Sequence, residues 1–427
     1  MGIKDTCTLI PMRLFKKKTM KFSYYNIVIP YKNDDYLLFN TANGAFARVA
    51  PSCYKIYNDK LINEGFVIDS DSDELLLLKY RYLSCLYKCS NIHLTIATTM
   101  NCNFACPYCF EAGHQHGENM NDQVIDAINK YLAAKRNKPI SITWFGGEPL
   151  LNWHAIDKIS SFLVDNEMQF NANIVTNGSL LSLSYIKKLD NYKIKSIQIT
   201  LDGTKEIHNS KRFYKSRKGT YDTIIDNIHK VLDNSLCEVV LRVNLDKTNI
   251  ENFKSLKNEI YNEYGFYIKN YRLRLWPNYI RNRTSFEGCS NCLTPVEFYD
   301  FEAGESNYCP KFPMLIGPCP LRSLSSMCIG PDGNIYKCME HIGNHKNCVG
   351  NILNAQFDLY KQADYALNAL PFENEMCRDC KILPICGGGC SIDARKNVLE
   401  KQNINLCSVE KDKLNEILIN YYEKFYA

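Results

Sequence analysis

The sequence predicts an α/β protein built on a parallel β-sheet, with a small N-terminal α+β unit before it and a cysteine-rich region after it. Between residues 91 and 285, short β-rich runs alternate with stretches of helical apolar spacing, as in βα repeats around a parallel sheet. Residues 1–90 carry strand-like runs and turns, whereas residues 286–410 lose apolar periodicity as cysteines become frequent. Residues 411–427 predict a C-terminal helix that packs on the rest.

Composition excludes several classes of protein. The chain has 427 residues, enough for two or three domains, and a formal charge of only +5, which argues against a nucleic-acid or anionic-membrane partner. No apolar run approaches the roughly 20 residues of a membrane helix. Twenty cysteines without a secretory signal indicate metal or cluster ligation in a reducing compartment, so a cytoplasmic location is expected.

The N-terminal unit is expected to begin with strands in "YYNIVIPY" and "YLLFNTANGAFARVA", separated by turn residues. One amphipathic helix is expected next, over residues 52–66. The pattern fits a separate compact module or an extension packed on the next domain.

Six βα repeats imply a parallel sheet that is either open or curled into part of a barrel, with the functional loops at the carboxyl ends of its strands. A cysteine triad follows the first strand, "GGEP" the second and "TNG" the third, so these loops should converge on one rim. The expected strands are IHLTIATT, ISITWFGG, ANIVTNG, SIQITLDG, EVVLRVNLD and YRLRLWP, with helices over 122–136, 155–167 and 220–233.

The cysteine triad comprises Cys102, Cys106 and Cys109 in one short loop. A metal site held by protein alone usually has four ligands, so three thiolates leave one coordination position open. The spacing CxxxCxxC, with Tyr108 before the last cysteine, closely resembles the signature of radical S-adenosylmethionine (SAM) enzymes. The resemblance implies a partial (β/α)6 barrel and a [4Fe-4S] cluster whose open iron is chelated by SAM.

Further residues carry this resemblance, although each alone could have a structural role. "GGEP" looks like the family's motif for the SAM amino group, in which glycines permit close backbone approach. Thr200 and Arg242 stand where relatives contact the SAM carboxylate or ribose, and Arg212 is a further candidate. The resemblance therefore implies SAM contacts from Tyr108, Gly146, Gly147, Glu148, Thr200, Arg212 and Arg242.

The C-terminal cysteines resemble the SPASM extension of the same superfamily, which holds two auxiliary [4Fe-4S] clusters. By that resemblance the first auxiliary cluster uses Cys319, Cys328, Cys338 and Cys390. The second uses Cys377, Cys380, Cys386 and Cys407. Spacing alone would also allow zinc ribbons. Four other cysteines are alternatives for an assigned ligand, namely Cys289, Cys292, Cys309 and Cys348.

The resemblance also implies the chemistry. An electron from a reducing partner such as flavodoxin or ferredoxin cleaves SAM to a 5'-deoxyadenosyl radical, which abstracts a substrate hydrogen. The auxiliary clusters would accept an electron or bind substrate. Glu340, His341 and Asp202 are candidate catalytic bases, with structural roles as the alternative.

Two branches of this architecture act on polypeptides, namely anaerobic sulfatase maturases, which form formylglycine, and maturases of ribosomally made peptides. Sulfatase maturases carry Asp after the cysteine where Met339 follows Cys338, and they lack the long region that precedes Cys102 here. The N-terminal unit is similar to the winged-helix element that binds leader peptides by strand addition.

We therefore expect a peptide maturase that forms a thioether or carbon-based crosslink on a precursor peptide with a leader. Formylglycine formation is the alternative within the family. A non-catalytic iron–sulfur or zinc protein, which binds peptide or carries electrons, is the alternative from another class. The sequence leaves open the peptide, the bond formed and the oligomeric state. The basic run "KRFYKSRKG" could attract an acidic peptide or the SAM carboxylate, or be a solvated loop.

Overall fold

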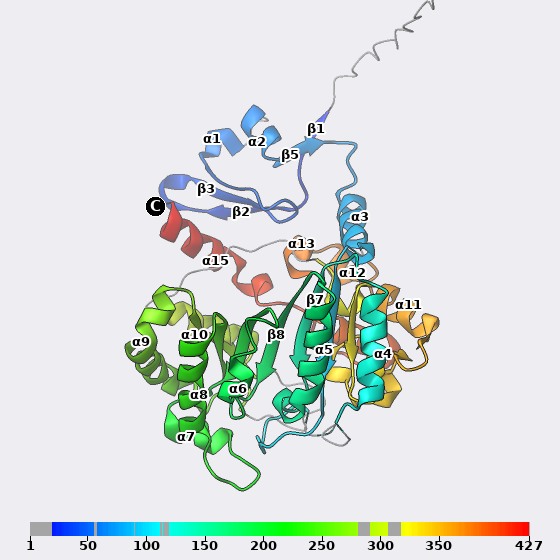
Figure 1. Ribbon diagram of the computed structural model, residues 1–427. Coiled ribbons are helices and arrows are strands. Elements are labelled where there is room, and N and C mark those ends of the chain that lie inside the picture. Colours follow the sequence, from blue (N-terminus) through cyan, green and yellow to red (C-terminus); the bar gives the residue numbers. More distant parts are fainter. Residues whose placement is uncertain are drawn as a thin grey trace, which may run out of the picture.

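The computed structural model describes residues 19–54, 58–88, 90–111, 113, 119–280, 291–305 and 317–426. The N-terminal unit and the C-terminal helix lie at one end of the molecule, above a large sheet with helices packed against it (Figure 1). No described helix combines the length and the apolar character needed to cross a bilayer.

A three-stranded antiparallel sheet forms the centre of the N-terminal unit. Its order is β2 (Asn26–Pro30), β3 (Tyr36–Asn40) and β4 (Phe46–Val49), which confirms the expected strands. A short 3-10 turn, η1 (Lys32–Asp34), connects β2 to β3. A second, two-stranded sheet pairs β1 (Met20–Phe22) with β5 (Val67–Asp69).

The single helix expected over residues 52–66 is wrong. The structure has two short helices, α1 (Pro51–Tyr54) and α2 (Asp59–Asn63). The cause is Asn58, which is extended at φ −116° and ψ 160° and whose side chain accepts a hydrogen bond from the Leu61 amide. This N-cap starts a new helix instead of continuing the old one.

Strand β3 presents alternate side chains to two separate cores. Leu38 packs with Leu61 inside the N-terminal unit, whereas Leu37 packs with Leu414 of α15 (Glu410–Phe425). Both faces of the small sheet are therefore covered, since strand side chains alternate between faces. The unit thus has its own core and shares a second core with the C-terminal region.

The central sheet has ten strands in the order β11-β10-β9-β8-β7-β6-β12-β13-β14-β15. The six strands of the βα repeats are parallel, stand in sequence order and confirm the six repeats. Within the described residues β6 and β11 do not pair, so this part of the sheet is not closed. The parallel strands are β6 (Ile92–Ala97), β7 (Ile140–Phe145), β8 (Phe170–Thr176), β9 (Ile194–Thr200), β10 (Glu238–Leu245) and β11 (Leu273–Tyr279).

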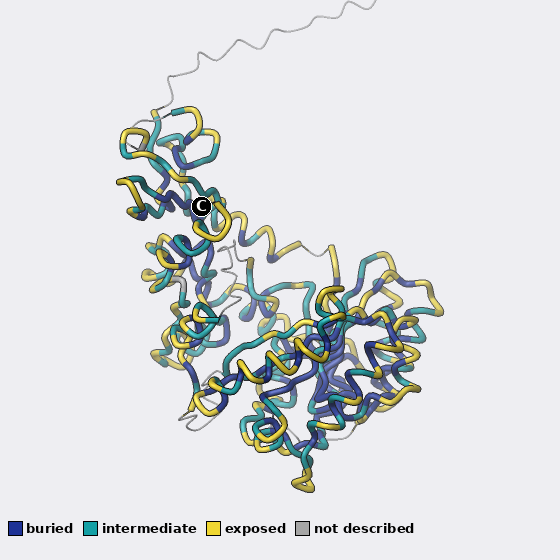
Figure 2. Tube along the Cα trace, turned by 90° about the vertical axis from the view of Figure 1, so that its left-hand side faces the viewer, coloured by how far each residue is buried: buried dark blue, intermediate teal, exposed yellow. Residues whose placement is uncertain are grey.

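Helices between these strands cover the sheet with their apolar sides. In α4, for example, the buried side chains of Val124, Ile128 and Leu132 recur every four residues. Figure 2 shows the sheet as a buried centre with more exposed elements around it. The elements are α4 (Asp122–Ala133), η3 (Pro149–Asn152), α5 (Trp153–Asp165), α6 (Leu183–Ile186), α7 (Lys205–Lys211), α8 (Tyr221–Asn234), η4 (Ile250–Asn252), α9 (Phe253–Lys269) and α10 (Pro295–Gly304).

The C-terminal region extends the same sheet. Strand β12 (Ser326–Ile329) lies parallel to β6, and β13 (Asn334–Tyr336), β14 (Gly350–Asn351) and β15 (Gln356–Phe357) follow it antiparallel. The expected domain boundary at residue 285 falls outside the described residues. Strands that precede and follow it in the sequence, β11 and β12, belong to the same sheet. The remaining helices are α3 (Glu74–Tyr87), η5 (Pro320–Arg322), η6 (Met339–His341), η7 (His345–Asn347), α11 (Leu359–Leu367), α12 (Glu375–Arg378), α13 (Leu383–Cys386) and α14 (Ser391–Leu399).

Candidate functional site

The cysteine triad lies in the loop after β6. Cys102 is buried, and Cys106 and Cys109 are half-buried. The Cys102 sulfur accepts hydrogen bonds from the Phe104 amide at 3.4 Å and from the Asn177 side-chain amide at 3.8 Å. These donors would stabilise a thiolate rather than a thiol.

The three thiols are close enough to influence one another. Burial, and then the charges of Glu148, Cys106 and Cys109, raise the pKa of Cys102 to about 11. Burial and neighbouring Cys106 also raise the pKa of Cys109 to about 11. Without a metal these groups would stay protonated, so metal binding must displace their protons.

The donor set of the cysteine loop fits an iron–sulfur cluster. Cys102, Cys106 and Cys109 would supply three of the four ligands of a [4Fe-4S] cluster and leave one iron without a protein ligand.

Gly146 and Gly147 bring the loop after β7 against the cysteine loop. The Gly147 amide donates to Thr99 O at 3.1 Å, and the Glu148 amide donates to Asn101 O at 2.8 Å. A Cβ atom on Gly146 would lie 2.1 Å from Thr99 O, and one on Gly147 would lie 2.5 Å from Asn101 O. Glycine is required here because two backbones of the same chain touch.

The carboxylate of Glu148 is fully buried and holds the end of β8. It accepts hydrogen bonds from the Thr176 hydroxyl at 2.7 Å, the Asn177 amide at 2.7 Å and the Leu150 amide at 3.0 Å. Burial raises its pKa, and these donors oppose the rise. A carboxylate has about four acceptor positions, so one is left for the ammonium group expected here.

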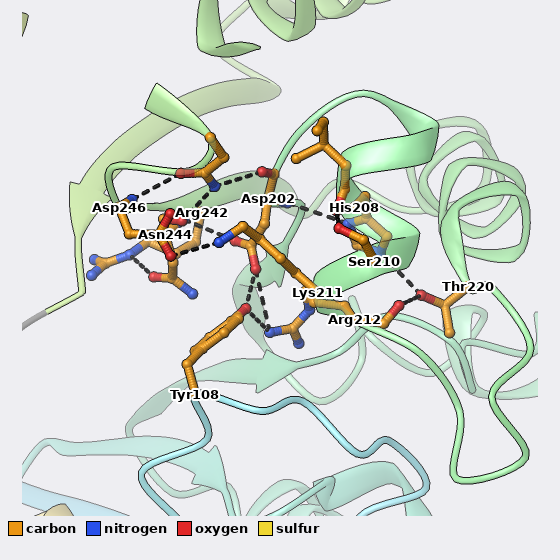
Figure 3. Close-up of polar contacts among 12 residues, drawn as sticks. Tyr108, Asp202, His208, Ser210, Lys211, Arg212, Thr220, Arg242, Asn244 and Asp246 are labelled. Atoms are coloured by element: carbon orange, nitrogen blue, oxygen red, sulfur yellow. Dashed lines mark hydrogen bonds and ion pairs between the residues drawn. The ribbon is translucent and has the colours of Figure 1, made fainter. Parts of the chain in front are cut away.

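Tyr108, which is half-buried, forms a cluster with the buried Asp202 and Arg212 (Figure 3). The Tyr108 hydroxyl donates to Asp202 Oδ2 and accepts from Arg212 Nη1 at 2.8 Å. The Asn244 amide donates to Asp202 Oδ1 at 2.9 Å, so both oxygens of Asp202 are engaged. Burial raises the pKa of Asp202, and the charge of Arg212 counteracts it. Asp202 is therefore placed as an anchor of the cysteine loop.

His208, which the sequence analysis did not select, connects this cluster to the loop after α7. The Asp202 amide donates to His208 Nδ1 at 3.2 Å. The Thr220 hydroxyl donates to Arg212 O at 2.8 Å, so at 3.0 Å it must accept from His208 Nε2. These partners assign a neutral ring with its proton on Nε2. Burial lowers the pKa of His208 to about 3. The sequence signal is its place four residues before Arg212.

Thr200 and Arg242 meet at the adjoining strand ends. They are register partners on β9 and β10. Arg242 Nε donates to Asn244 Oδ1 at 3.0 Å, and its guanidinium lies 4.9 Å from the ring centroid of Trp276. Trp276, also not selected from the sequence, is the register partner of Arg242 in the middle of β11 and holds it by a cation–π contact.

The structure places a buried carboxylate after the cysteine loop, within the electrostatic influence of Glu340. Glu111 is buried, and its Oε2 has no hydrogen-bond partner in the described part of the chain. Burial, and then the charge of Glu340, raise its pKa to about 8. Glu340 lies in η6, which begins directly after Cys338. The Nδ1 atom of its neighbour His341 lies 3.1 Å from the Tyr365 hydroxyl. Glu111 was not predicted, although it stands two residues after Cys109.

Arg322 lies beside part of the set expected at the first auxiliary cluster. Burial, then Glu340, Cys328 and Cys319, raise the pKa of Cys338. Arg322 follows Cys319 closely, and its Nε donates to the hydroxyl of Ser391, the neighbour of Cys390, at 3.0 Å. Arg322 also donates to Asn368 O and Ala369 O, at 2.7 Å each. A buried guanidinium thus holds a region that has little regular structure.

The second expected set also lies together. Burial raises the pKa of Cys377, followed by the charges of Cys386, Cys407 and Cys380. Lys411 donates to the exposed Cys407 sulfur at 3.5 Å.

Of the alternative cysteines, Cys348 packs against the same apolar cluster as Cys328. Cys348 donates to Gly350 O at 3.0 Å, and Cys292 is disulfide-bonded. Cys289 and Cys309 lie outside the described residues.

Comparison with known proteins places this geometry in a family. Residues 96–260 match the model of the radical SAM superfamily. The cysteine-type anaerobic sulfatase-maturating enzyme of Clostridium perfringens is 24% identical over 68% of this chain and 85% of its own length. The radical SAM cyclopropyl synthase TigE of Paramaledivibacter caminithermalis is 22% identical over 46% of this chain and 54% of its own length.

Solved structures show the same fold. Native anSMEcpe with bound AdoMet and Cp18Cys peptide covers 78% of this chain and 97% of its own, at 19% identity and TM-score 0.58. Streptococcus suis SuiB covers 91% of this chain and 100% of its own, at 15% identity and TM-score 0.55.

Coverage of the relatives varies. The chain spans about half the length of TigE (54%) and of an uncharacterised Methanocaldococcus jannaschii protein (46%).

The superfamily's domain implies one [4Fe-4S] cluster and SAM. Residues 96–260, with the Cys102, Cys106 and Cys109 loop at their start, are a radical SAM domain related to those of the cyclopropyl synthase TigE and the sulfatase-maturating enzyme.

Proposed function

We propose that the chain is a radical SAM maturase that recognises the leader of a ribosomally made precursor peptide and forms a thioether or carbon-based crosslink. The observation that carries this proposal is the compact unit before β6, with its own three-stranded sheet. SuiB, also solved bound to its precursor peptide SuiA, resembles 91% of this chain, whereas anSMEcpe resembles 78%. The winged-helix likeness of the unit supports leader binding by strand addition.

The site residues have separate proposed roles. Cys102, Cys106 and Cys109 would hold the first cluster, and the seven SAM contacts expected from the sequence would surround the cosubstrate. When bound, cluster and SAM supply a one-electron route to hydrogen abstraction. The chain's own residues orient them: Gly147 fixes the two loops together, and Asp202 holds Tyr108 in place.

The C-terminal cysteines would hold two auxiliary clusters in a SPASM arrangement, in the two sets expected from the sequence. The proximity of their thiols supports this proposal. Of the candidate bases Asp202 is the least favoured, because both of its oxygens already accept hydrogen bonds, and Glu340 and His341 stay the candidates.

Anaerobic reconstitution followed by SAM and dithionite tests the enzyme class. We expect 5'-deoxyadenosine from the wild type and none from the variant with Cys102, Cys106 and Cys109 changed to Ala. Three clusters predict about twelve iron atoms per chain, and about eight in the variant. A fully iron-loaded wild type that yields no 5'-deoxyadenosine would leave a non-catalytic iron–sulfur protein. About four iron atoms together with zinc would overturn the auxiliary clusters.

Sulfatase maturation is the second candidate, supported by the 24% identity to the Clostridium perfringens enzyme over 85% of its length. Met339 after Cys338 and the N-terminal unit weigh against it. Mass spectrometry distinguishes the two. A crosslinked precursor peptide loses a hydrogen pair, an epimerised one keeps its mass, and a sulfatase peptide would gain an aldehyde at its cysteine. Aldehyde formation with an unchanged precursor would reverse the assignment.

A further inference from the structure

A hairpin after α7 adds a strand to the cysteine loop. The Ala105 amide donates to Phe213 O at 2.9 Å, and the Lys215 amide donates to Asn103 O at 3.0 Å. The rings of Phe104 and Tyr214 meet edge to face with centroids 5.2 Å apart. The stem of this hairpin is therefore fixed to the backbone between Cys102 and Cys106.

Three exposed cations occupy the tip of this hairpin, namely Lys215, Arg217 and Lys218, here called the cationic tip. Across the part of the chain that the structure describes, none of the three has a carboxylate within ion-pair distance. Lys211, in the same basic run, pairs with Asp246 at 2.5 Å, and Arg212 faces Asp202 at 3.9 Å. Two cations of the run are thus neutralised by carboxylates inside the protein. The other three carry charge that no described carboxylate balances, and the Arg217 guanidinium also lies 4.6 Å from the ring centroid of Phe213.

From this geometry we infer that the cationic tip is the docking surface for an acidic electron-donor protein. The inference rests on the proposed function and adds the place where its reductant binds. Unpaired like charges on one loop attract a partner of opposite sign and accelerate its encounter. Since the stem is hydrogen-bonded to the cysteine loop, a donor seated on the tip lies next to the cluster ligands.

The arrangement favours an electron donor over the acidic peptide considered from the sequence. The unit proposed to hold the leader lies above the sheet, at the end opposite α7 and its following loop (Figure 1). An electron donor needs only to come close to the group held by the three cysteines, because no atom or proton is transferred. In each encounter the donor is oxidised by one electron and that group is reduced by one.

The test compares wild type with K215E/R217E/K218E and with a matched charge-reversal control at exposed lysines on α4 and α9, K130E/K254E/K269E. Binding of oxidised flavodoxin, an acidic FMN protein, is measured by titration calorimetry at two salt concentrations. SAM cleavage is then measured with flavodoxin hydroquinone and, separately, with dithionite.

The inference predicts that the tip variant binds flavodoxin at least about tenfold more weakly and loses most of the salt dependence. Its flavodoxin KM should rise similarly, while cleavage with dithionite stays at the wild-type rate. Unchanged flavodoxin binding, an equal loss in the control, or loss of precursor-peptide binding alone would overturn it. The milder K215A/R217N/K218A variant replaces the first if charge reversal lowers iron content. A wild type that binds flavodoxin but cleaves no SAM with dithionite would instead refute the proposed function.

Discussion

The Tyr108 hydroxyl donates a hydrogen bond to the carboxylate of Asp202, which joins the cysteine loop after β6 to the end of β9. Arg212 lies against both groups, 2.8 Å from the hydroxyl and 3.9 Å from the carboxylate. An anion, a cation and a phenol thus contact one another in a largely buried position. The loop that presents the cysteines is held by the end of β9, three strands away at the same edge of the sheet.

Replacing Asp202 by Asn should destabilise the protein strongly. The change leaves the charge of Arg212 buried without its partner, and breaking a buried pair in this way costs about 3–5 kcal/mol. We expect a lower midpoint of chemical denaturation and reduced iron retention. Tyr108→Phe, which removes one hydroxyl, should cost about 1 kcal/mol. If Asp202→Asn kept full stability and iron yet lost turnover, Asp202 would be a base and not an anchor.

Gly147→Ala should uncouple the loops after β6 and β7. Its Cβ would lie 2.5 Å from two backbone oxygens, those of Asn101 and Met100, which cannot move aside as a side chain could. We expect a loss of at least about 1–3 kcal/mol and a weaker affinity for SAM, measured by denaturation and by calorimetry. Gly265→Ala in α9 is the matched control, because nothing lies within 4 Å of its added Cβ. Equal behaviour of the two variants would contradict the role given to Gly147.

The neutral His208 predicts how stability depends on pH. Its pKa is lowered from 6.5 to about 3 in the folded protein, so below pH 6.5 the unfolded chain binds a proton that the folded chain does not. The free energy of unfolding should therefore fall as the pH drops from 6.5 toward 3, by at most about 1.4 kcal/mol per pH unit from this group. His208→Gln keeps a donor toward Thr220 and should make that slope shallower.

Urea unfolding of both proteins across this pH range provides the measurement. His93→Gln, at an exposed histidine, serves as the control and should leave the wild-type slope nearly unchanged. A slope in His208→Gln as steep as that of the wild type would show that other groups account for it.

The two auxiliary sets should lose iron independently. Cys338→Ala should release the iron of the first set and Cys377→Ala that of the second, about four atoms each, because each removes one ligand of a separate cubane. Cys348→Ala should retain all iron, since its thiol donates to Gly350 O at 3.0 Å. Iron analysis with electron paramagnetic resonance gives the counts. Loss of iron from Cys348→Ala would mean that this cysteine replaces an assigned ligand.

The sequence by itself determined the six parallel strands and the loops that follow them. Alternating apolar runs and turn residues are local signals, and parallel strands place their carboxyl ends on one edge whatever the details of packing. The spacing of Cys102, Cys106 and Cys109 indicated the family from the sequence alone, because a short loop fixes its own ligand geometry. The signals that predicted the N-terminal strands were equally local.

Only the tertiary structure decided the rest. That Asp202 anchors the cysteine loop and that the charge of Glu340 acts on Glu111 depend on segments far apart in the sequence. Such interactions arise from packing between distant elements, which no local periodicity encodes. The contact of His208 with Asp202 and the N-cap at Asn58 are local in the sequence, but each depends on a side-chain hydrogen bond that apolar periodicity does not reveal.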